Sequence, residues 1–234
     1  MIEIIPAILP KNYEDMKNKI SLVRGIVPIV QIDICDGIFV KNITWPFTMG
    51  RNGDYNFQNI LQEREGMPFW EDVDFELDLM VANAVKNFDI YTKLGAKRII
   101  FHIETDEIKR DLTGFKDFIE GIDVYVRDTL EIGVAINSTT PLEQIFPIVK
   151  CVDFVQCMGI EHIGFQEQDF DERVLEQIKN LKEKFNDLII SVDGGVTLDT
   201  APELIDAGAS RLVAGSAIFQ QNDIIDIIEK FKNL

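Results

Sequence analysis

Short apolar runs that are rich in β-branched residues alternate with amphipathic stretches along the chain. The apolar runs cover residues 2–9, 26–34, 75–81, 97–104, 131–137, 152–158, 188–195 and 210–218. Such nearly continuous runs are typical of parallel strands that are buried on both faces. The stretches between them favour helices. The first of these places Met16, Ile20 and Val23 at helical spacing.

This alternation predicts eight strand–helix pairs. The helices are expected at residues 12–23, 57–63, 84–95, 111–121, 142–150, 171–185, 198–208 and 222–231. Alternating strands and helices form right-handed parallel crossovers, so eight such units predict an α/β fold. That fold is a (β/α)8 TIM barrel, built as a single domain over residues 1–234. Residues 47–73 are expected to form a long loop around one short helix, and residues 121–130 are expected to be extra material before the fifth strand.

The composition narrows the class of function. The chain has 234 residues, 46% of them apolar, and a formal net charge of −17. This charge argues against a nucleic-acid or anionic-membrane partner, because Lys and Arg bind phosphate backbones, whereas backbone N–H groups can still hold one small phosphorylated ligand. Cys35, Cys151 and Cys157 show no C-x-x-C spacing, which fits a cytoplasmic protein without disulfides or thiolate-bound zinc. Pro6 and Pro10 break the apolar N-terminus, so neither a signal peptide nor a membrane span is expected.

Polar side chains stand where several of the predicted strands end. They are Gln31, Asp33, Asp78, His102, Glu104, Asn137 and Asp193. Gln31 and Asp33 are two residues apart and share a strand face, and active sites of such barrels lie at the carboxyl ends of the strands. Asp33, Asp78 and Asp193 are therefore expected to converge on the barrel mouth. The alternative for Asp78 is an outward orientation, paired with a surface Lys or Arg.

Carboxylates that converge in this way repel one another. One of them must hold a proton, or the site must bind a cation or a positively charged substrate. His102, within an apolar run, is expected to be a partly buried, hydrogen-bonded residue and not a ligand or a base.

Two glycine turns follow the last two predicted strands, at residues 193–196 (DGGV) and 214–218 (AGSAI). Barrels often bind phosphate at these two loops, where backbone N–H groups can face an anion. Gly194, Gly195 and Gly215 let the backbone approach closely, and Ser216 adds a hydroxyl donor. The polar segment after the sixth strand is expected to form either a loop over the mouth or an ordinary surface loop.

These motifs together resemble the ribulose-phosphate 3-epimerase family over nearly the whole chain. QIDICDGIFVKNIT (31–44) resembles the signature H-x-D-x-M-D-G-x-F-V-P-N-I-T, and ELDLMV (76–81) matches the position of D-x-H-L-M-V. IIFHIE, SVDGGV and VAGSAIF resemble further motifs of the family. The resemblance implies a barrel that inverts C3 of a ketose phosphate of the ribulose 5-phosphate/xylulose 5-phosphate type. Two aspartates, matched here by Asp33 and Asp193, would move the proton, and a divalent metal would stabilise the enediolate.

The sequence departs from the family at the metal ligands. The family's metal is held by two His and the two Asp, and the two His positions are Gln31 and Asp78 in this chain. The resemblance therefore implies a site of oxygen ligands only, from Gln31, Asp33, Asp78 and Asp193. Such a site suits Mg²⁺ or Mn²⁺ better than Zn²⁺. No organic cofactor is expected.

The sixth loop departs as well. The usual N-P-G-F-G-G-Q reads IEHIGFQEQ (160–168) here and keeps Gly164, which we count with the phosphate-binding residues, as well as Phe165 and Gln168. Three functions stay open: an epimerase, a barrel that binds a phosphorylated sugar without epimerising it, and a phosphosugar lyase or decarboxylase. The last ranks lowest, because DLMVAN (78–83) lacks the Lys of the related D-x-K-x-x-D motif. The partner is a small phosphorylated sugar in each case, and the chain is compatible with a homo-oligomer.

Overall fold

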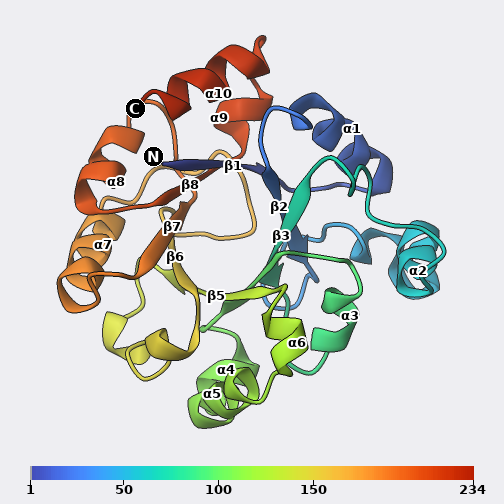
Figure 1. Ribbon diagram of the computed structural model, residues 1–234, viewed down its shortest axis with the longest axis horizontal. Coiled ribbons are helices and arrows are strands. Elements are labelled where there is room, and N and C mark those ends of the chain that lie inside the picture. Colours follow the sequence, from blue (N-terminus) through green and yellow to red (C-terminus); the bar gives the residue numbers. More distant parts are fainter. Residues whose placement is uncertain (1) are drawn as a thin grey trace.

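Eight parallel strands close into a barrel in the computed structural model, which describes residues 2–234 and, at 51 and 52, the backbone only. The strands are β1 (Glu3–Ile8), β2 (Ile29–Cys35), β3 (Asp74–Met80), β4 (Arg98–His102), β5 (Glu131–Asn137), β6 (Phe154–Met158), β7 (Ile189–Asp193) and β8 (Arg211–Ala214). They pair in chain order, and β8 closes on β1. Figure 1 shows the ring of strands with the helices around it. The predicted TIM barrel is confirmed.

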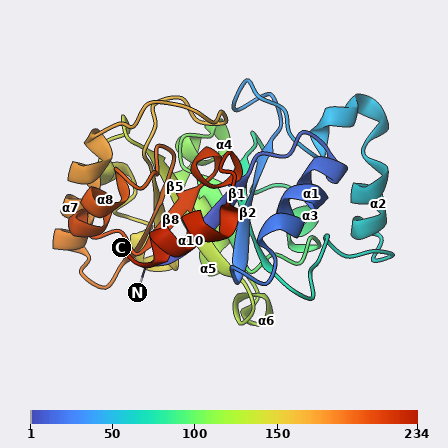
Figure 2. The ribbon, with the colours of Figure 1, turned by 90° about the horizontal axis from the view of Figure 1, so that it is seen from above.

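The helices form the outer layer, and Figure 2 shows the strands between α7 and α8 on one side and α1 to α3 on the other. They are α1 (Tyr13–Val23), α2 (Tyr55–Leu61), α3 (Phe88–Thr92), α4 (Asp106–Arg110), α5 (Leu112–Glu120), α6 (Val124–Arg127), α7 (Arg173–Lys184), α8 (Ala201–Ala207), α9 (Ser216–Phe219) and α10 (Ile224–Lys232), with 3₁₀ segments at Phe47–Asn52, Leu142–Gln144 and Val149–Cys151. The α1 stripe of Met16, Ile20 and Val23 is buried, as the pattern predicts. Within residues 2–234, no helix has the length and apolar character of a membrane span.

Two predicted elements change type in the structure. The helix expected at 142–150 is absent, because Pro147 lacks the N–H that an α-helix needs in its interior, and two short 3₁₀ segments take its place. The strand expected at 210–218 ends at Ala214. Gly215, at φ −96° and ψ −88°, turns the chain out of the extended conformation and into α9.

The helix expected at 84–95 is shorter than predicted and covers only α3. The carboxylate of Glu107 accepts hydrogen bonds from the backbone N–H groups of Val85 (3.0 Å) and Lys86 (3.0 Å). These bonds hold the first residues of the segment in turns. The extra material at 121–130 contains the one-turn helix α6.

The strand register sets the heights of the polar side chains inside the barrel. β2 and β3 pair Gln31 with Glu76 and Asp33 with Asp78, so the two pairs stand at successive levels along the barrel axis. Ile32, which alternates with them, packs outward in the large apolar cluster between strands and helices. The level of Asp33 and Asp78 lies at the carboxyl ends of the strands, where barrel active sites form.

A charged cluster fills the opposite end of the barrel. Arg98 contacts Glu3 at 3.2 Å, Glu76 at 3.3 Å and Glu131 at 3.1 Å, and Arg211 contacts Glu3 and Glu131 at 3.0 Å each. Burial raises the pKa of Glu76 to about 7, although both guanidinium groups oppose the shift. The two arginines therefore compensate a carboxylate that is completely buried.

Replacing Arg98 by Met is expected to lower the free energy of unfolding by about 3 to 5 kcal/mol at pH 8, because it leaves the charge of Glu76 buried with a weaker partner. The loss should be smaller near pH 5.5, where Glu76 can hold a proton. Urea unfolding at the two pH values measures both effects. The control is Arg110→Met in the exposed Arg110–Asp106 pair, which should change stability by no more than about 0.5 kcal/mol. Equal losses in the two variants would contradict the role of the cluster.

Candidate active site

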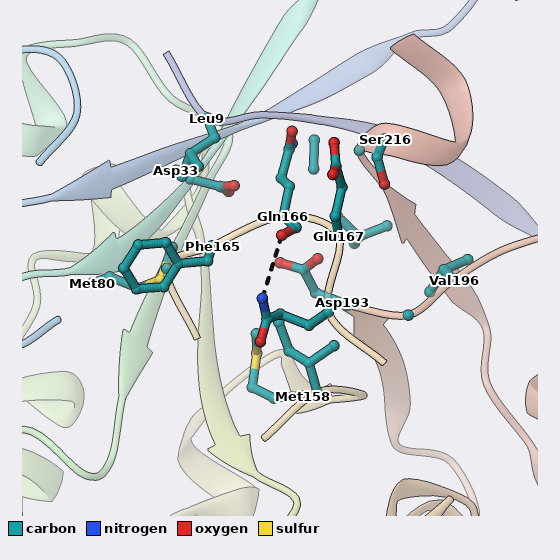
Figure 3. Close-up of a pocket in the computed structure, with 18 of the residues that line it drawn as sticks. Leu9, Asp33, Met80, Met158, Phe165, Gln166, Glu167, Asp193, Val196 and Ser216 are labelled. Carbon is teal, nitrogen blue, oxygen red and sulfur yellow. Dashed lines mark hydrogen bonds between the residues drawn. The ribbon is translucent and has the colours of Figure 1, made fainter. Parts of the chain in front are cut away.

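Three carboxylates from three strands meet at the carboxyl end of the barrel. Asp33 (β2), Asp78 (β3) and Asp193 (β7) each place one oxygen within 4.8 Å of the others. Asp33 and Asp193 line a pocket that opens at this end (Figure 3). Asp78 lies beneath them and is completely buried, so the alternative of an outward Asp78 paired with a surface cation is wrong.

Gln31 lies between two of these carboxylates. Its Nε2 donates to Oδ1 of Asp33 and to Oδ2 of Asp193, both at 2.7 Å. Its Oε1 is buried and finds no hydrogen-bond partner in the described part of the chain. One neutral amide thus bridges the two residues that the sequence marks as proton-transfer candidates.

His102 supports the third carboxylate. Its Nε2 lies 2.7 Å from Oδ1 of Asp78, and both side chains are completely buried. Burial alone would lower the pKa of His102, but the Asp78 carboxylate outweighs it and the pKa is raised. His102 is therefore hydrogen-bonded as expected, but buried throughout and not partly. Oδ2 of Asp78 has no hydrogen-bond partner among residues 2–234.

Burial and mutual repulsion change the acidity of the two pocket aspartates. Burial, followed by the charges of Asp193 and Asp78, raises the pKa of Asp33 well above its ordinary value. Burial and the charge of Asp78 raise the pKa of Asp193 to about 7, although the Gln31 amide and His102 oppose the shift. Near neutral pH this pair therefore retains a proton that free aspartates would have lost.

The same side chains fit a divalent cation. Three carboxylate oxygens stand close together, and Oδ2 of Asp78 is buried without a partner within residues 2–234. Rotation of the Gln31 amide would turn Oε1 toward the carboxylates, an arrangement that a cation among these oxygens would favour. Carboxylate and amide oxygens are the donors that Mg²⁺ and Mn²⁺ prefer.

The two glycine turns border the same pocket. Gly194, Gly195, Gly215 and Ser216 all line it. Gly194 and Gly195 have φ of +94° and +66°, and a Cβ on Gly195 would lie 3.0 Å from the carbonyl oxygen of Gly159. A side chain at Gly195 would therefore strain the turn and crowd the neighbouring loop.

The loop of residues 159–170 reaches over the mouth, and its segment Gly164–Gln168 lines the pocket. Asn42 Nδ2 donates to the carbonyl oxygen of Gly164 at 2.8 Å, and Glu167 is hydrogen-bonded to Gln220, just after α9. His162 is exposed. Sequence reasoning did not single out Asn42, Gln166, Glu167 or Gln220, because a loop without periodicity gives no signal for where its side chains point.

Chelator-treated protein is expected to lose stability as the pH rises toward neutrality. The native state keeps a proton on Asp193 that the unfolded chain releases near 3.8, so the contribution is complete below that value and lost by the folded pKa of about 7. One such proton gives a slope of about 1.4 kcal/mol per pH unit. Urea unfolding at several pH values measures the slope. Asp193→Asn should flatten it, the exposed control Asp187→Asn should not, and a flat parent curve would contradict the shift.

Comparisons with known proteins agree with this architecture. The sequence profile of the "Ribulose-phosphate 3 epimerase family" matches residues 3–219. The ribulose-phosphate 3-epimerase of Bacillus subtilis is 31% identical over 231 residues, covering 95% of this chain and 94% of that protein. The ribulose-phosphate 3-epimerase of Aquifex aeolicus is 29% identical over 237 residues, covering 99% and 96%.

A solved structure agrees at the level of the fold. KGPDC from Streptococcus mutans, crystallised in complex with a phosphosugar, superposes with a TM-score of 0.70 at 14% identity, covering 99% of this chain and 96% of that one. The profile match spans most of the chain, and relatives of this similarity run along nearly its full length. The chain belongs to the ribulose-phosphate 3-epimerase family.

Proposed function

We propose that this chain is an isomerase that inverts C3 of a ketose phosphate of the ribulose 5-phosphate/xylulose 5-phosphate type. One observation carries the proposal: two buried carboxylates, Asp33 and Asp193, enter a single pocket from β2 and β7. Inversion needs a proton taken from one face of a carbon and returned to the other, which two separate acids can do. Family membership supports the same reaction, and the similar Streptococcus mutans structure holds a phosphosugar.

The acidity of the pair suits this role. C3 lies next to the ketone, so loss of its proton leaves negative charge on the substrate oxygens. Asp193, with a pKa of about 7, and Asp33, with a raised pKa, share a proton near neutrality. One carboxylate can then accept the C3 proton while the other carboxyl group donates one from the opposite side.

The glycine turns are proposed to hold the phosphate. Gly194 and Gly195 follow β7, and Gly215 and Ser216 follow β8, on the same side of the pocket wall. Their backbone N–H groups are donors that an anion can share without a cationic side chain. Gly164 on the covering loop lines the pocket as well and is proposed to complete the subsite.

A divalent cation is proposed at Gln31, Asp33, Asp78 and Asp193, with Mg²⁺ or Mn²⁺ favoured over Zn²⁺. A cation held there acts as a Lewis acid on the oxygen where negative charge develops. Asp78 would serve only as a ligand, since it is buried away from the pocket and does not line it.

A second function is favoured by one contact. The Gln31 Nε2 already satisfies Asp33 and Asp193 at 2.7 Å each, so the pair is stable without a cation. A barrel in this state would bind a phosphorylated sugar without epimerising it. The occupancy of the cation site therefore distinguishes the two functions.

Asp33→Asn and Asp193→Asn are each expected to slow net epimerisation roughly 10²- to 10⁴-fold. Each variant should still exchange the C3 proton of one epimer with solvent, because one carboxylate remains to serve one face. NMR in D₂O with added Mn²⁺, started from ribulose 5-phosphate and from xylulose 5-phosphate, measures exchange and inversion separately. Asp169→Asn, an exposed acid on the covering loop, is the control. Full inversion by either variant, or no exchange by the parent, would contradict the proposal.

Mn²⁺ is expected to bind the parent with a Kd below about 1 mM and to bind Asp78→Asn roughly 10- to 100-fold more weakly, since the variant lacks one charged ligand. Calorimetric titration after chelator treatment measures both, and elemental analysis of untreated protein shows which metal it carries. The Asp169→Asn control should match the parent. A parent without affinity in this range would rule out the cation site and favour the second function.

A further inference from the structure

The covering loop brings two polar side chains against the glycine turns. Gln166 and Glu167 line the pocket together with Gly195, Gly215 and Ser216. In the view of Figure 3 both side chains extend in the same direction, between the positions of Asp33 and Ser216. A Cβ on Gly215 would lie 2.5 Å from Nε2 of Gln166, so this amide packs directly on the second turn.

Glu167 is held in this position from two directions. Its carboxylate is hydrogen-bonded to the side chain of Gln220, which follows α9. Its backbone has a φ of +61°, in the left-handed region that glycine prefers. The side chain is also exposed, so its charge faces both the pocket and the solvent.

The pocket contains no compensating positive charge. Its ionisable lining residues are Asp33, Glu167 and Asp193, and no Lys, Arg or His lines it within residues 2–234. A phosphate dianion held by the two turns would share this space with the Glu167 carboxylate. Two like charges at this separation repel, and solvent around the rim weakens the repulsion without removing it.

We infer that Glu167 is a specificity-determining residue that weakens the binding of a phosphate dianion at the glycine turns. Gln166, beside it, offers an uncharged amide donor in the same subsite. The subsite thus discriminates by charge: the loop supplies hydrogen bonds to the terminal group of the sugar and penalises its second negative charge. This inference rests on the proposed function, because it assumes that the turns hold the phosphate.

The test compares the parent with Glu167→Gln, which keeps the size and backbone of the residue and removes its charge. Calorimetric titration with inorganic phosphate and with ribulose 5-phosphate at pH 8 should show roughly three- to tenfold tighter binding by the variant at low salt. The difference should narrow at about 0.5 M NaCl, because salt screens an exposed charge. Glu161→Gln, which removes an exposed charge from the same loop outside the pocket, should bind both probes as the parent does.

The outcomes separate this inference from the proposal beneath it. If the parent and Glu167→Gln bind both probes equally, or the variant binds more weakly, the inference is overturned and the phosphate site stands. A gain that does not depend on salt would show a steric effect of the loop and would also overturn it. If neither protein binds either probe, the phosphate site itself is wrong and the inference falls with it.

Discussion

Three buried carboxylates in one small space impose the constraint on which the rest of this site depends. Asp33, Asp78 and Asp193 place oxygens within 4.8 Å of one another, and a low-dielectric setting makes their repulsion costly. The surroundings offer three kinds of relief: the N–H groups of Gln31, the imidazole of His102 and retained protons. A site that compensates its charge only in part is prepared to receive a cation or to exchange a proton.

The other end of the same barrel shows the contrast. Glu76 is as deeply buried as Asp78, but two arginines surround its cluster. Guanidinium groups supply fixed positive charge and several donors each, so this end is structurally complete. At the mouth, no arginine or lysine lines the pocket within residues 2–234. This asymmetry in compensation separates the structural end of the barrel from the reactive end more clearly than burial does.

The order of the elements could be predicted because strands buried on both faces leave continuous apolar runs, and the convergence of Asp33 and Asp193 could be expected from their places at strand ends. The limit of α9 could not, since the apolar letters after Ala214 suit a strand or a helix equally and only the Gly215 conformation decides. The direction of Asp78 depends on the β2–β3 register, and its contact with His102 joins strands 24 residues apart in sequence. Neither has a periodic signature.

The replacement of two imidazoles by Gln31 and Asp78 becomes understandable as a redistribution of charge. A carboxylate at position 78 adds a negative charge, and His102 stands directly behind it with a raised pKa, so a positive charge can balance the addition. Gln31 then serves two states with one rotation: its N–H₂ faces Asp33 and Asp193 when no cation is present, and its Oε1 would face a bound one. Oδ2 of Asp78 is free of hydrogen bonds within residues 2–234, so it need not break one to become a ligand. The site can therefore gain or lose a cation without rearrangement of the strands that carry it.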